Sequence, residues 1–532
     1  MAPGDPLHSK KHFSFATTLL PTIGNMIFVA LLFVLVFNSG NGLLGDGDTG
    51  YHIRTGELIL KEWRIPALDP YSYHVPPLNW TAHEWLAEVI MAIIHSVSGL
   101  TGIVLFFSVL LTLTHWYLYQ ILRGESKDII LCTIITLLAA ATSSSHWFAR
   151  PHVFSLFLTL LWYHLLNQFQ YKDRRTLVYL PLIMLLWANL HGGFIMGLIL
   201  LSIYLTGNTI TAYFGGPSEA RHAQQKLRPL AFCIAATALV SLINPIGYKL
   251  LVFPFHVTAN QFVMDRVAEF LSPNFHEVLP FKYMFLAMLV SLALARSPLN
   301  SIQLGILVLL SYMALYSVRH VSLYAILVAP ILLNSSKNIA NHLPGSWLKA
   351  YHQRNANLET VEQSLRAWLW PSAAILLPCV LALTGQLHYE FDRKVFPVAA
   401  VNFLQRENIS GNMFNNDEFG DYMIFSIWPK YRVFMDGRSD MYGEKYGSAY
   451  LKLANALPGW KEILAQYKID WIIFDTRSPL TSILSEQKDW QAIYSDKIAT
   501  IFLKKNVANH SILTRYSDVK VDRPSGLSGS SY

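Results

Sequence analysis

Charge and cysteine are scarce in this chain of 532 residues. Only 14% of the residues are charged and 53% are hydrophobic, which is more apolar side chain than a soluble protein buries. The three cysteines, Cys132, Cys233 and Cys379, all lie inside apolar runs, so they indicate small core residues and exclude a disulfide framework. The sequence therefore leaves the redox compartment open.

Several functional motifs are absent as well. There is no phosphate-binding Walker loop, no evident repeat and no nucleotide-sugar domain, and nothing indicates nucleic acid, haem, flavin or zinc. The formal net charge of +7 resembles a nucleic-acid signal, but the basic residues fall mostly in short loops between apolar runs. We interpret this charge as a topology signal and expect no nucleic-acid partner.

Long apolar runs are present instead, and they recur up to about position 390. A spanning helix needs about 20 apolar residues, so these runs predict a polytopic α-helical membrane protein with about 11 transmembrane helices. The first run is too long for a cleaved signal peptide and should follow a cytoplasmic N-terminus, residues 1–18. The expected spans are 19–37, 99–122, 129–147, 153–170, 177–190, 194–213, 229–250, 281–295, 301–316, 321–333 and 368–388.

Alternate threading of these spans, with the N-terminus inside, places most loop lysines and arginines on the inner side, as the positive-inside rule requires. The unusual polar clusters, which were not used to build the threading, all fall on the outer side. Ionisable groups near hydrocarbon are costly, so we expect them to share one cavity that opens outward. The clusters are 46–48, 149–152, 189–193, 244–248, 265–269 and 317–320.

The chain divides into four parts. The transmembrane domain is expected at 19–390, with a first outer loop at 44–98 that contains an interfacial amphipathic helix at 80–96. In 391–505, short β-rich runs at 413–414, 432–435, 471–474 and 498–503 alternate with helical patterns, which predicts a soluble α/β domain on the outer side. The tail, 506–532, is rich in serine and glycine near its end and is expected to be disordered.

The stretch 45–57 opens the first outer loop. Asp46 and Asp48 are one residue apart, His52 and Arg54 follow, and glycines lie between them. Glycine lets a backbone turn sharply and approach a ligand closely. Taken alone, the stretch is a polar loop that ends a membrane helix, but the outer clusters together favour a functional site.

These features resemble the GT-C class of integral membrane glycosyltransferases. Residues 46–54 resemble the first-loop acidic motif of family 39, protein O-mannosyltransferase-like enzymes and of the oligosaccharyltransferase catalytic subunit. Residues 267–269 lie where oligosaccharyltransferases carry a short motif ending in Glu, and 417–422 with 434–438 resemble their Trp-Trp-Asp-Tyr-Gly region and the strand after it. Residues 187–194 and 436–438 also resemble bacterial family 39-like glycosyltransferases.

The sequence departs from these families in two places. Glu418 and Phe419 replace the two tryptophans of the signature, so reading of an acceptor sequon is not implied. The second acidic motif that helps to hold the metal of oligosaccharyltransferases is replaced by Arg150-Pro151-His152. Metal dependence is therefore open.

The resemblance implies transfer of a sugar from a polyprenyl-phosphate-linked donor to a protein, lipid or glycan acceptor on the extracytoplasmic side. Membrane lipid would be a further partner, and the bacterial inner (plasma) membrane the location. The residues agree with this chemistry, because transfer from a sugar phosphate needs a carboxylate base and cations that hold the departing phosphate. Arginine is the better bidentate phosphate partner.

We expect the following roles. Asp48 and Asp46 are the catalytic candidates, and Arg319, Arg150, His320 and Arg54 are placed to bind the donor phosphate. The polar cavity residues are His52, His152, His191, Asn189 and Asn244, with Asp436 and Arg438 on the acceptor side. If a divalent cation (Mg²⁺ or Mn²⁺) binds, its hard-oxygen ligands are Asp46, Asp48 and Glu269.

Structural alternatives stand beside these roles. His152 and His191 can be interhelical hydrogen-bonding residues, Arg150 and Arg319 can snorkel, and residues 436–438 can form a structural turn. At the level of function, the alternatives are a transporter or flippase for lipid-linked or anionic solutes, and a non-catalytic membrane scaffold. Transporters place charge at the membrane midplane in paired halves, whereas these acids lie at one surface.

Overall fold

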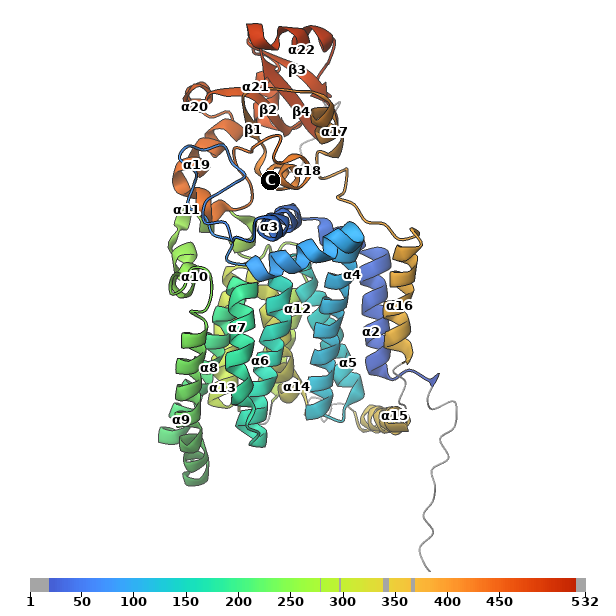
Figure 1. Ribbon diagram of the computed structural model, residues 1–532. Coiled ribbons are helices and arrows are strands. Elements are labelled where there is room, and N and C mark those ends of the chain that lie inside the picture. Colours follow the sequence, from blue (N-terminus) through green and yellow to red (C-terminus); the bar gives the residue numbers. More distant parts are fainter. Residues whose placement is uncertain (1–18, 278, 296–297, 338–343, 365–368, 523–532) are drawn as a thin grey trace, which may run out of the picture.

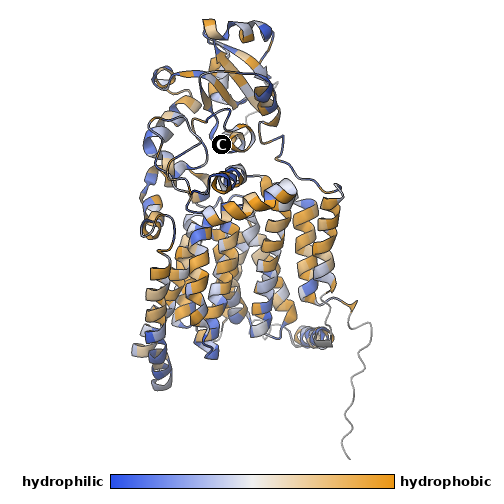
Figure 2. Ribbon diagram, viewed as in Figure 1, coloured by the Kyte–Doolittle hydropathy of each residue, from blue (hydrophilic) through white to orange (hydrophobic). Residues whose placement is uncertain are grey.

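A bundle of long helices carries a smaller C-terminal domain on one end, hereafter the domain-bearing end (Figure 1). The computed structural model describes residues 19–277, 279–295, 298–337, 344–364 and 369–522. The expected cytoplasmic N-terminus, 1–18, lies outside the described residues. Figure 2 shows that the bundle helices are predominantly hydrophobic along their length, as helices surrounded by lipid are.

Each apolar run of the sequence overlaps a helix. By length and composition, four described segments are long and apolar enough to cross a membrane: Trp85–Glu125, Ile129–His146, Gly192–Phe214 and Val318–Ser336. The number of crossings stays a prediction, because the other bundle helices are either shorter or less apolar. The bundle helices are α2 (Ile23–Phe33), α4 (Trp85–Glu125), α5 (Ile129–Ser143), α6 (His152–Lys172), α7 (Leu180–Leu190), α8 (Ile195–Phe214), α9 (Pro217–Val240), α12 (Pro280–Leu294), α13 (Ser301–Tyr316), α14 (Val321–Ser336) and α16 (Leu369–Leu383).

Shorter elements join the bundle helices. A π-helical turn, η1 (Val34–Asn38), continues α2, and α10 (Lys249–Ala259) with α11 (Gln261–Met264) lies at the domain-bearing end, whereas α15 (Gly345–Ser364) lies at the opposite end (Figure 1). The 3-10 turns are η2 (Gly40–Leu44), η3 (Ser144–His146), η4 (Thr176–Tyr179), η5 (Gly192–Phe194), η6 (Ala268–Phe270) and η7 (Val318–His320).

Helix α4 is bent at Gly99, where φ is 60°. Glycine adopts this left-handed conformation without the clash that a Cβ atom would cause. The first arm lies across the domain-bearing end of the bundle and the second arm runs down into it (Figure 1). The expected interfacial helix at 80–96 and the expected span at 99–122 are therefore two arms of one helix.

The stretch 45–57 is a correction to the sequence interpretation, because most of it is helical. Helix α3 (Asp48–Glu62) begins at the second aspartate and lies between α4 and the C-terminal domain (Figure 1). Gly56 is inside this helix, and a Cβ atom there would collide with the Glu88 carbonyl of α4. Glycine thus serves close helix packing at this position, whereas we expected a sharp turn.

The C-terminal domain is α/β, as predicted. Its four-stranded sheet has the order β1-β2-β4-β3, with β1 parallel to β2 and the other pairs antiparallel. Its strands are β1 (Asn412–Asn415), β2 (Ile469–Asp475), β3 (Trp490–Ser495) and β4 (Ala499–Lys504), and its helices are α17 (Val398–Arg406), α18 (Asp417–Ile427), α19 (Ser439–Ala454), α20 (Trp460–Gln466), α21 (Pro479–Leu484) and α22 (His510–Arg515), with a 3-10 turn η9 (Val507–Asn509).

Two expectations for this domain need correction. Residues 432–435 form no named strand, since only Val433 bridges to another segment, at Ser72 of the first outer loop. The segment 506–522, expected to be disordered, contains η9 and α22, because Leu513 is buried and the Gln491 side chain of β3 donates to the Leu513 carbonyl at 2.8 Å. The rest of the tail lies outside the described residues.

Candidate functional site

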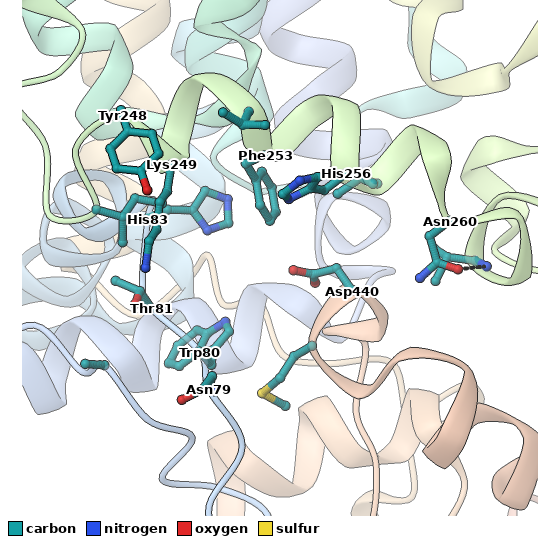
Figure 3. Close-up of a pocket in the computed structure, with 16 residues that line it drawn as sticks. Asn79, Trp80, Thr81, His83, Tyr248, Lys249, Phe253, His256, Asn260 and Asp440 are labelled. Atoms are coloured by element: carbon teal, nitrogen blue, oxygen red, sulfur yellow. Dashed lines mark hydrogen bonds between the residues drawn. The ribbon is translucent and has the colours of Figure 1, made fainter.

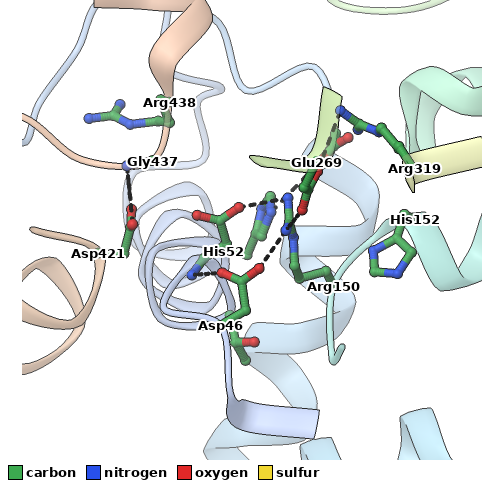
Figure 4. Close-up of polar contacts among 12 residues, drawn as sticks. Asp46, His52, Arg150, His152, Glu269, Arg319, Asp421, Gly437 and Arg438 are labelled. Carbon is green, nitrogen blue, oxygen red and sulfur yellow. Dashed lines mark hydrogen bonds and ion pairs between the residues drawn. The ribbon is translucent and has the colours of Figure 1, made fainter. Parts of the chain in front are cut away.

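A cavity of about 460 Å³ lies where the domain-bearing end of the bundle meets α3 and the C-terminal domain. Polar clusters that are far apart in the sequence line it, and Figure 4 shows their side chains pointing toward one another. The predicted site residues among the lining are Asp46, Asp48, His52, Arg150, His152, His191, Glu269, Arg319, Asp436 and Arg438. The outer clusters thus meet at one end of the bundle, as the threading required.

Arg150 lies at the centre of an acidic cluster. Its Nη1 is 2.5 Å from Asp46 Oδ2 and 2.5 Å from Glu269 Oε1, and its Nη2 is 2.7 Å from Asp48 Oδ2. Three carboxylates therefore share one guanidinium in a partly dehydrated setting, where ion pairs are strong and unpaired charge is costly. The side chain of Arg150 is 14% exposed, so the cluster faces the cavity.

The two aspartates have different surroundings. Asp46 precedes Gly47, the N-cap of α3, and its Oδ1 accepts a hydrogen bond from the Asp48 backbone N–H at 2.9 Å in an Asx turn, while its other oxygen binds Arg150. Asp48, the first residue of α3, keeps Oδ1 beside Gly437 of the C-terminal domain, where a Cβ atom would collide with it. Both carboxylate oxygens of Asp46 are therefore bonded, whereas Asp48 has one oxygen, Oδ1, that forms no ion pair with Arg150.

The electrostatics separate the carboxylates further. Burial raises the pKa of Asp48 to about 8, with Asp46 and Glu269 adding to the rise and Arg150 opposing it. Burial also acts to raise the pKa of Glu269, but Arg150 and Arg319 outweigh it and bring that pKa to about 2. Carboxylates whose pKa values are pushed apart take different roles. Asp48 can exchange a proton near neutral pH, and Glu269 stays charged.

Arg319 is a cation of the cavity that can bind a further anion. Its Nη1 is 3.8 Å from Glu269 Oε2 and its guanidinium lies over the Phe270 ring at 5.4 Å. The side chain is 33% exposed, and Figure 4 shows it at the edge of the acidic cluster. A guanidinium with a single long ion pair can bind an incoming anion through two parallel hydrogen bonds.

The C-terminal domain supplies a further carboxylate, Asp421 of α18. The Gly437 backbone N–H donates to both oxygens of Asp421, at 3.0 and 3.1 Å (Figure 4). Burial raises the pKa of Asp421, and Asp48 and Asp436 add to the rise. A Cβ atom at 437 would collide with the Asp48 and Asp421 carboxylates, so any side chain there would force these two groups to move.

A histidine cluster lines the cavity next to α4. His52 is 3.1 Å from Glu88 and 3.7 Å from Glu84, and His191 Nε2 is 3.4 Å from Glu84 Oε1. His191 Nδ1 accepts the Gly193 N–H at 2.9 Å, so its neutral form carries the proton on Nε2 and directs it at Glu84. Burial lowers the pKa of His52, which indicates neutral imidazole. These contacts make the cluster a hydrogen-bonded wall of the cavity.

Four predicted residues are not among the lining. Arg54 donates to Glu57 at 2.6 Å and to the Phe425 carbonyl, so it joins α3 to α18. Asn189 accepts the Trp85 Nε1–H at 2.8 Å and ties α7 to α4. Asn244 accepts the Ile246 N–H at 2.8 Å and shapes its own turn, and His320 belongs to η7 beside Arg319. The sequence shows that these four side chains are polar, but it does not show whether each one points into the cavity.

Asp436 and Arg438 line the cavity and also form an ion-pair lock, that is, a cluster that joins the C-terminal domain to the first outer loop. Arg438 Nε and Nη2 donate to Asp436 at 2.7 and 2.6 Å, and Nη2 is 2.8 Å from Asp69 of the first outer loop. The guanidinium lies over the rings of Trp80, at 4.5 Å, and Tyr71, at 4.9 Å. This arrangement agrees with the structural alternative for residues 436–438.

The arrangement does not fit a divalent cation as it stands. Asp46, Asp48 and Glu269 converge, as a hard-oxygen ligand set would, but they converge on the Arg150 guanidinium. Among the residues that the structure describes, no group of three His, Cys, Asp or Glu side chains is placed to hold a metal ion. A positive charge of the protein itself lies at the focus of the three carboxylates.

Sequence reasoning missed several lining residues, including Glu84, His83, His146 and Asp417, and it also missed Asp421, which lies behind Gly437. Glu84 was visible only as a polar residue of an amphipathic helix. Asp421 lies in the acidic stretch 417–422, which resembles a family motif, but the sequence assigned no role to Asp421 itself. Their positions depend on how α4 and α18 pack on α3, which no local pattern encodes.

Comparisons with known proteins agree with this architecture. No protein-family model matches the chain, and no curated protein matches its sequence. Among solved structures, the Archaeoglobus fulgidus oligosaccharyltransferase in its apo form has a TM-score of 0.52 at 12% identity, covering 91% of this chain and 74% of that one. The same enzyme tethered to an acceptor peptide with the NVT sequon has a TM-score of 0.51, at 12% identity and the same coverage.

A third structure, archaeal oligosaccharyltransferase AglB from Archaeoglobus fulgidus with an inhibitory peptide and a dolichol-phosphate, has a TM-score of 0.52 at 11% identity. It is matched over 85% of this chain and 69% of that one. At such low identity the likeness establishes the fold alone. The chain has a GT-C fold like that of the oligosaccharyltransferases.

Proposed function

We propose that this chain is an integral membrane glycosyltransferase that transfers a sugar from a polyprenyl-phosphate-linked donor to an acceptor on the extracytoplasmic side. The observation that carries the proposal is the meeting of Asp48, Arg150, Glu269 and Arg319 in one cavity at the domain-bearing end. The fold supports it, since a structural neighbour is a complex with a dolichol-phosphate. The location we propose is the bacterial inner membrane, with the N-terminus cytoplasmic.

Asp48 is the base in this proposal. The nucleophile of the acceptor gives its proton to Asp48 and attacks the anomeric carbon, and the bond from that carbon to the phosphate oxygen breaks. The polyprenyl phosphate leaves with the electron pair of that bond, so a single displacement inverts the anomeric centre. A carboxyl with a pKa of about 8 takes this proton more readily than an ordinary aspartate does.

Arg319 and Arg150 divide the work on the phosphate. Arg319 has a partly exposed guanidinium and binds the phosphate directly, since among the described residues it forms one ion pair, the 3.8 Å contact to Glu269. Arg150 keeps Asp48 in place and adds positive charge beside the departing group. Groups of this kind stabilise charge that grows in the transition state, and they are already oriented before the reaction.

The test is turnover in lipid vesicles that contain the full chain and a radiolabelled polyprenyl-phosphate sugar. Asp48→Asn should lower turnover by at least about a thousandfold, because an amide takes no proton from the nucleophile. Glu57→Gln is the matched control: it removes a carboxylate from the same helix, but Glu57 pairs with Arg54 and His95 away from the cavity. Its turnover should stay within about threefold of the wild type.

Thermal unfolding of both variants separates chemistry from folding. The proposal expects nearly equal midpoints for Asp48→Asn and the wild type, since an aspartate with a raised pKa is already largely neutral. Full turnover in folded Asp48→Asn would exclude this residue as the base. Binding and movement of the donor without any transfer, in the wild type, would favour a flippase.

A further inference from the structure

A second, larger cavity adjoins the first. It measures about 890 Å³ and lies between α10, the first outer loop and the start of α19 (Figure 3). We call it the outer chamber. It is a neighbour of the first cavity, because the two share five lining residues: His83, Phe253, Val257, Val263 and Asp440.

Aromatic surface and free polar groups are mixed in the outer chamber. Trp80 lines the chamber with a small exposed part of its ring, 9% of the residue, while the Arg438 guanidinium lies on the ring at 4.5 Å. Tyr248 is 68% exposed at the opposite side. Figure 3 shows Thr81, Lys249 and Asp440 around this space with no hydrogen bond between them.

These polar groups are available to a ligand. Asn260 is engaged, since it accepts the Val263 N–H at 3.4 Å, but the side chains of Asn79, Thr81, Lys249 and Asp440 make no hydrogen bond to any residue that the structure describes. Cavities with apolar or aromatic walls and a few convergent polar groups are typical ligand sites, and 890 Å³ is near the upper end of their usual size.

We infer that the outer chamber binds a saccharide next to the reacting sugar, an inference that rests on the proposed function. A pyranose presents C–H faces to an aromatic ring and hydroxyl groups at its rim, which matches Trp80 and Tyr248 surrounded by Asn79, Thr81, Lys249 and Asp440. A polyprenyl tail fits poorly, because the chamber carries charge at Lys249 and Asp440.

An extended peptide fits less well than a saccharide. One common way in which an extended peptide binds is to add a strand to an exposed sheet edge. None of the strands β1 to β4 lines the chamber in the described part of the chain, and its walls come from α10, α11, the start of α19 and loop residues. Saccharide recognition needs no such edge.

Two sources of saccharide share this chemistry. The chamber can hold further sugars of a donor whose first sugar lies beside Asp48, or it can hold a saccharide acceptor whose hydroxyl reaches that sugar. Both need the two cavities to lie side by side, and His83, Phe253 and Asp440 line each of them. In either case the saccharide in the chamber is longer than the unit that reacts.

The experiment measures binding of a panel of free tetrasaccharides to the purified full chain by saturation-transfer NMR and titration calorimetry. The double variant Lys249→Ala/Asp440→Ala removes the charged groups of the chamber and should weaken binding by at least about tenfold, as loss of two charge-assisted hydrogen bonds does. Thr81→Trp, which fills the chamber, should block binding. The control is Lys461→Ala, because Lys461 is an exposed residue of α20 and pairs with Gln487.

Turnover with a polyprenyl-phosphate monosaccharide distinguishes the sources. A bound tetrasaccharide that becomes radiolabelled is an acceptor, and one that slows turnover without becoming labelled mimics the donor glycan; either result supports the inference. The inference is overturned if no tetrasaccharide binds, or if one binds the double variant and Thr81→Trp as tightly as the wild type. A wild type that binds tetrasaccharide but turns over no donor contradicts the proposed function alone.

Discussion

Two buried arginines, Arg150 and Arg438, lie at the same end of this molecule and differ in almost every other respect. Arg150 is shared by Asp46, Asp48 and Glu269 and is 14% exposed to the cavity. Arg438 is paired with Asp436 and Asp69, is 2% exposed, and lies between aromatic rings. The first cluster has an excess of acid that faces open space, and the second is closed.

The difference shows that arginine–aspartate ion pairs can take part in a reaction at one site and hold two domains together at another. In the Arg150 cluster the surplus of negative charge leaves Asp48 with a pKa of about 8, so a proton can move there. In the Arg438 cluster, the ion pairs join the C-terminal domain to the first outer loop. Burial acts to lower the pKa of Arg438, but Asp436 and Asp69 outweigh it and keep that pKa well above its usual range. Four predictions test this contrast.

The largest effect is expected from the closed cluster. Arg438→Ala leaves Asp436 and Asp69 buried without their cation, and removal of one partner from a buried ion pair costs about 3–5 kcal/mol of unfolding free energy. Chemical denaturation of the full chain in detergent measures this change. Arg432→Ala, at an exposed position three residues after the Pro429 turn, is the control. A loss below about 1 kcal/mol would show that Arg438 is not a lock.

Arg150→Ala should act mainly on catalysis. Loss of one charge-stabilising group costs about 10²–10³ in turnover, and the three carboxylates can relieve their repulsion by taking up protons from the cavity. The measurement is the turnover number at saturating donor, beside the midpoint of thermal unfolding. Lys61→Ala, an exposed substitution on α3, should leave both unchanged. If Arg150→Ala destabilises the chain as much as Arg438→Ala does, both clusters have a structural role and the contrast between them is wrong.

The pH dependence of turnover should follow Asp48. The groups that face it are Asp46, Glu269, Asp421 and Asp436, which favour the protonated form, and Arg150, which favours the charged form. Because a base acts only when deprotonated, turnover should rise about tenfold per pH unit and level off near pH 8. A profile between pH 5.5 and 9 measures this, and Glu57→Gln should keep its shape. A flat profile between pH 6 and 8 would show that deprotonation of Asp48 does not control turnover.

The smallest effect is expected from chelation. We propose that Arg150 supplies the positive charge at the focus of Asp46, Asp48 and Glu269 that a divalent cation would otherwise supply. Treatment with EDTA should then change turnover by less than about twofold, because none of the stabilising charge is removed. Loss of turnover that Mg²⁺ or Mn²⁺ restores would instead place a metal among the three carboxylates.

Much of the fold was predictable because apolar runs carry a strong signal. Alternate threading of the predicted spans was enough to place the outer clusters at one end of the bundle. It led us to expect Asp46, Asp48, Arg150, Glu269 and Arg319 in one cavity, which they line. The helical nature of α3 was not predictable, since glycine has low helix propensity and four glycines occur within 45–56. Close packing against α4 and α18 overrides that propensity.

The sequence by itself determined the helical membrane architecture, the α/β domain and the side of the bundle on which the polar clusters lie, because hydropathy and loop charge act locally along the chain. Only the tertiary structure decided which carboxylate meets which arginine, that Asp48 has one oxygen without an ion pair while both oxygens of Asp46 are bonded, and that Arg54 joins α3 to α18 and does not line the cavity. Those outcomes depend on the packing of α3, α4 and α18, and an ion pair forms only where packing brings its two charges within a few ångströms.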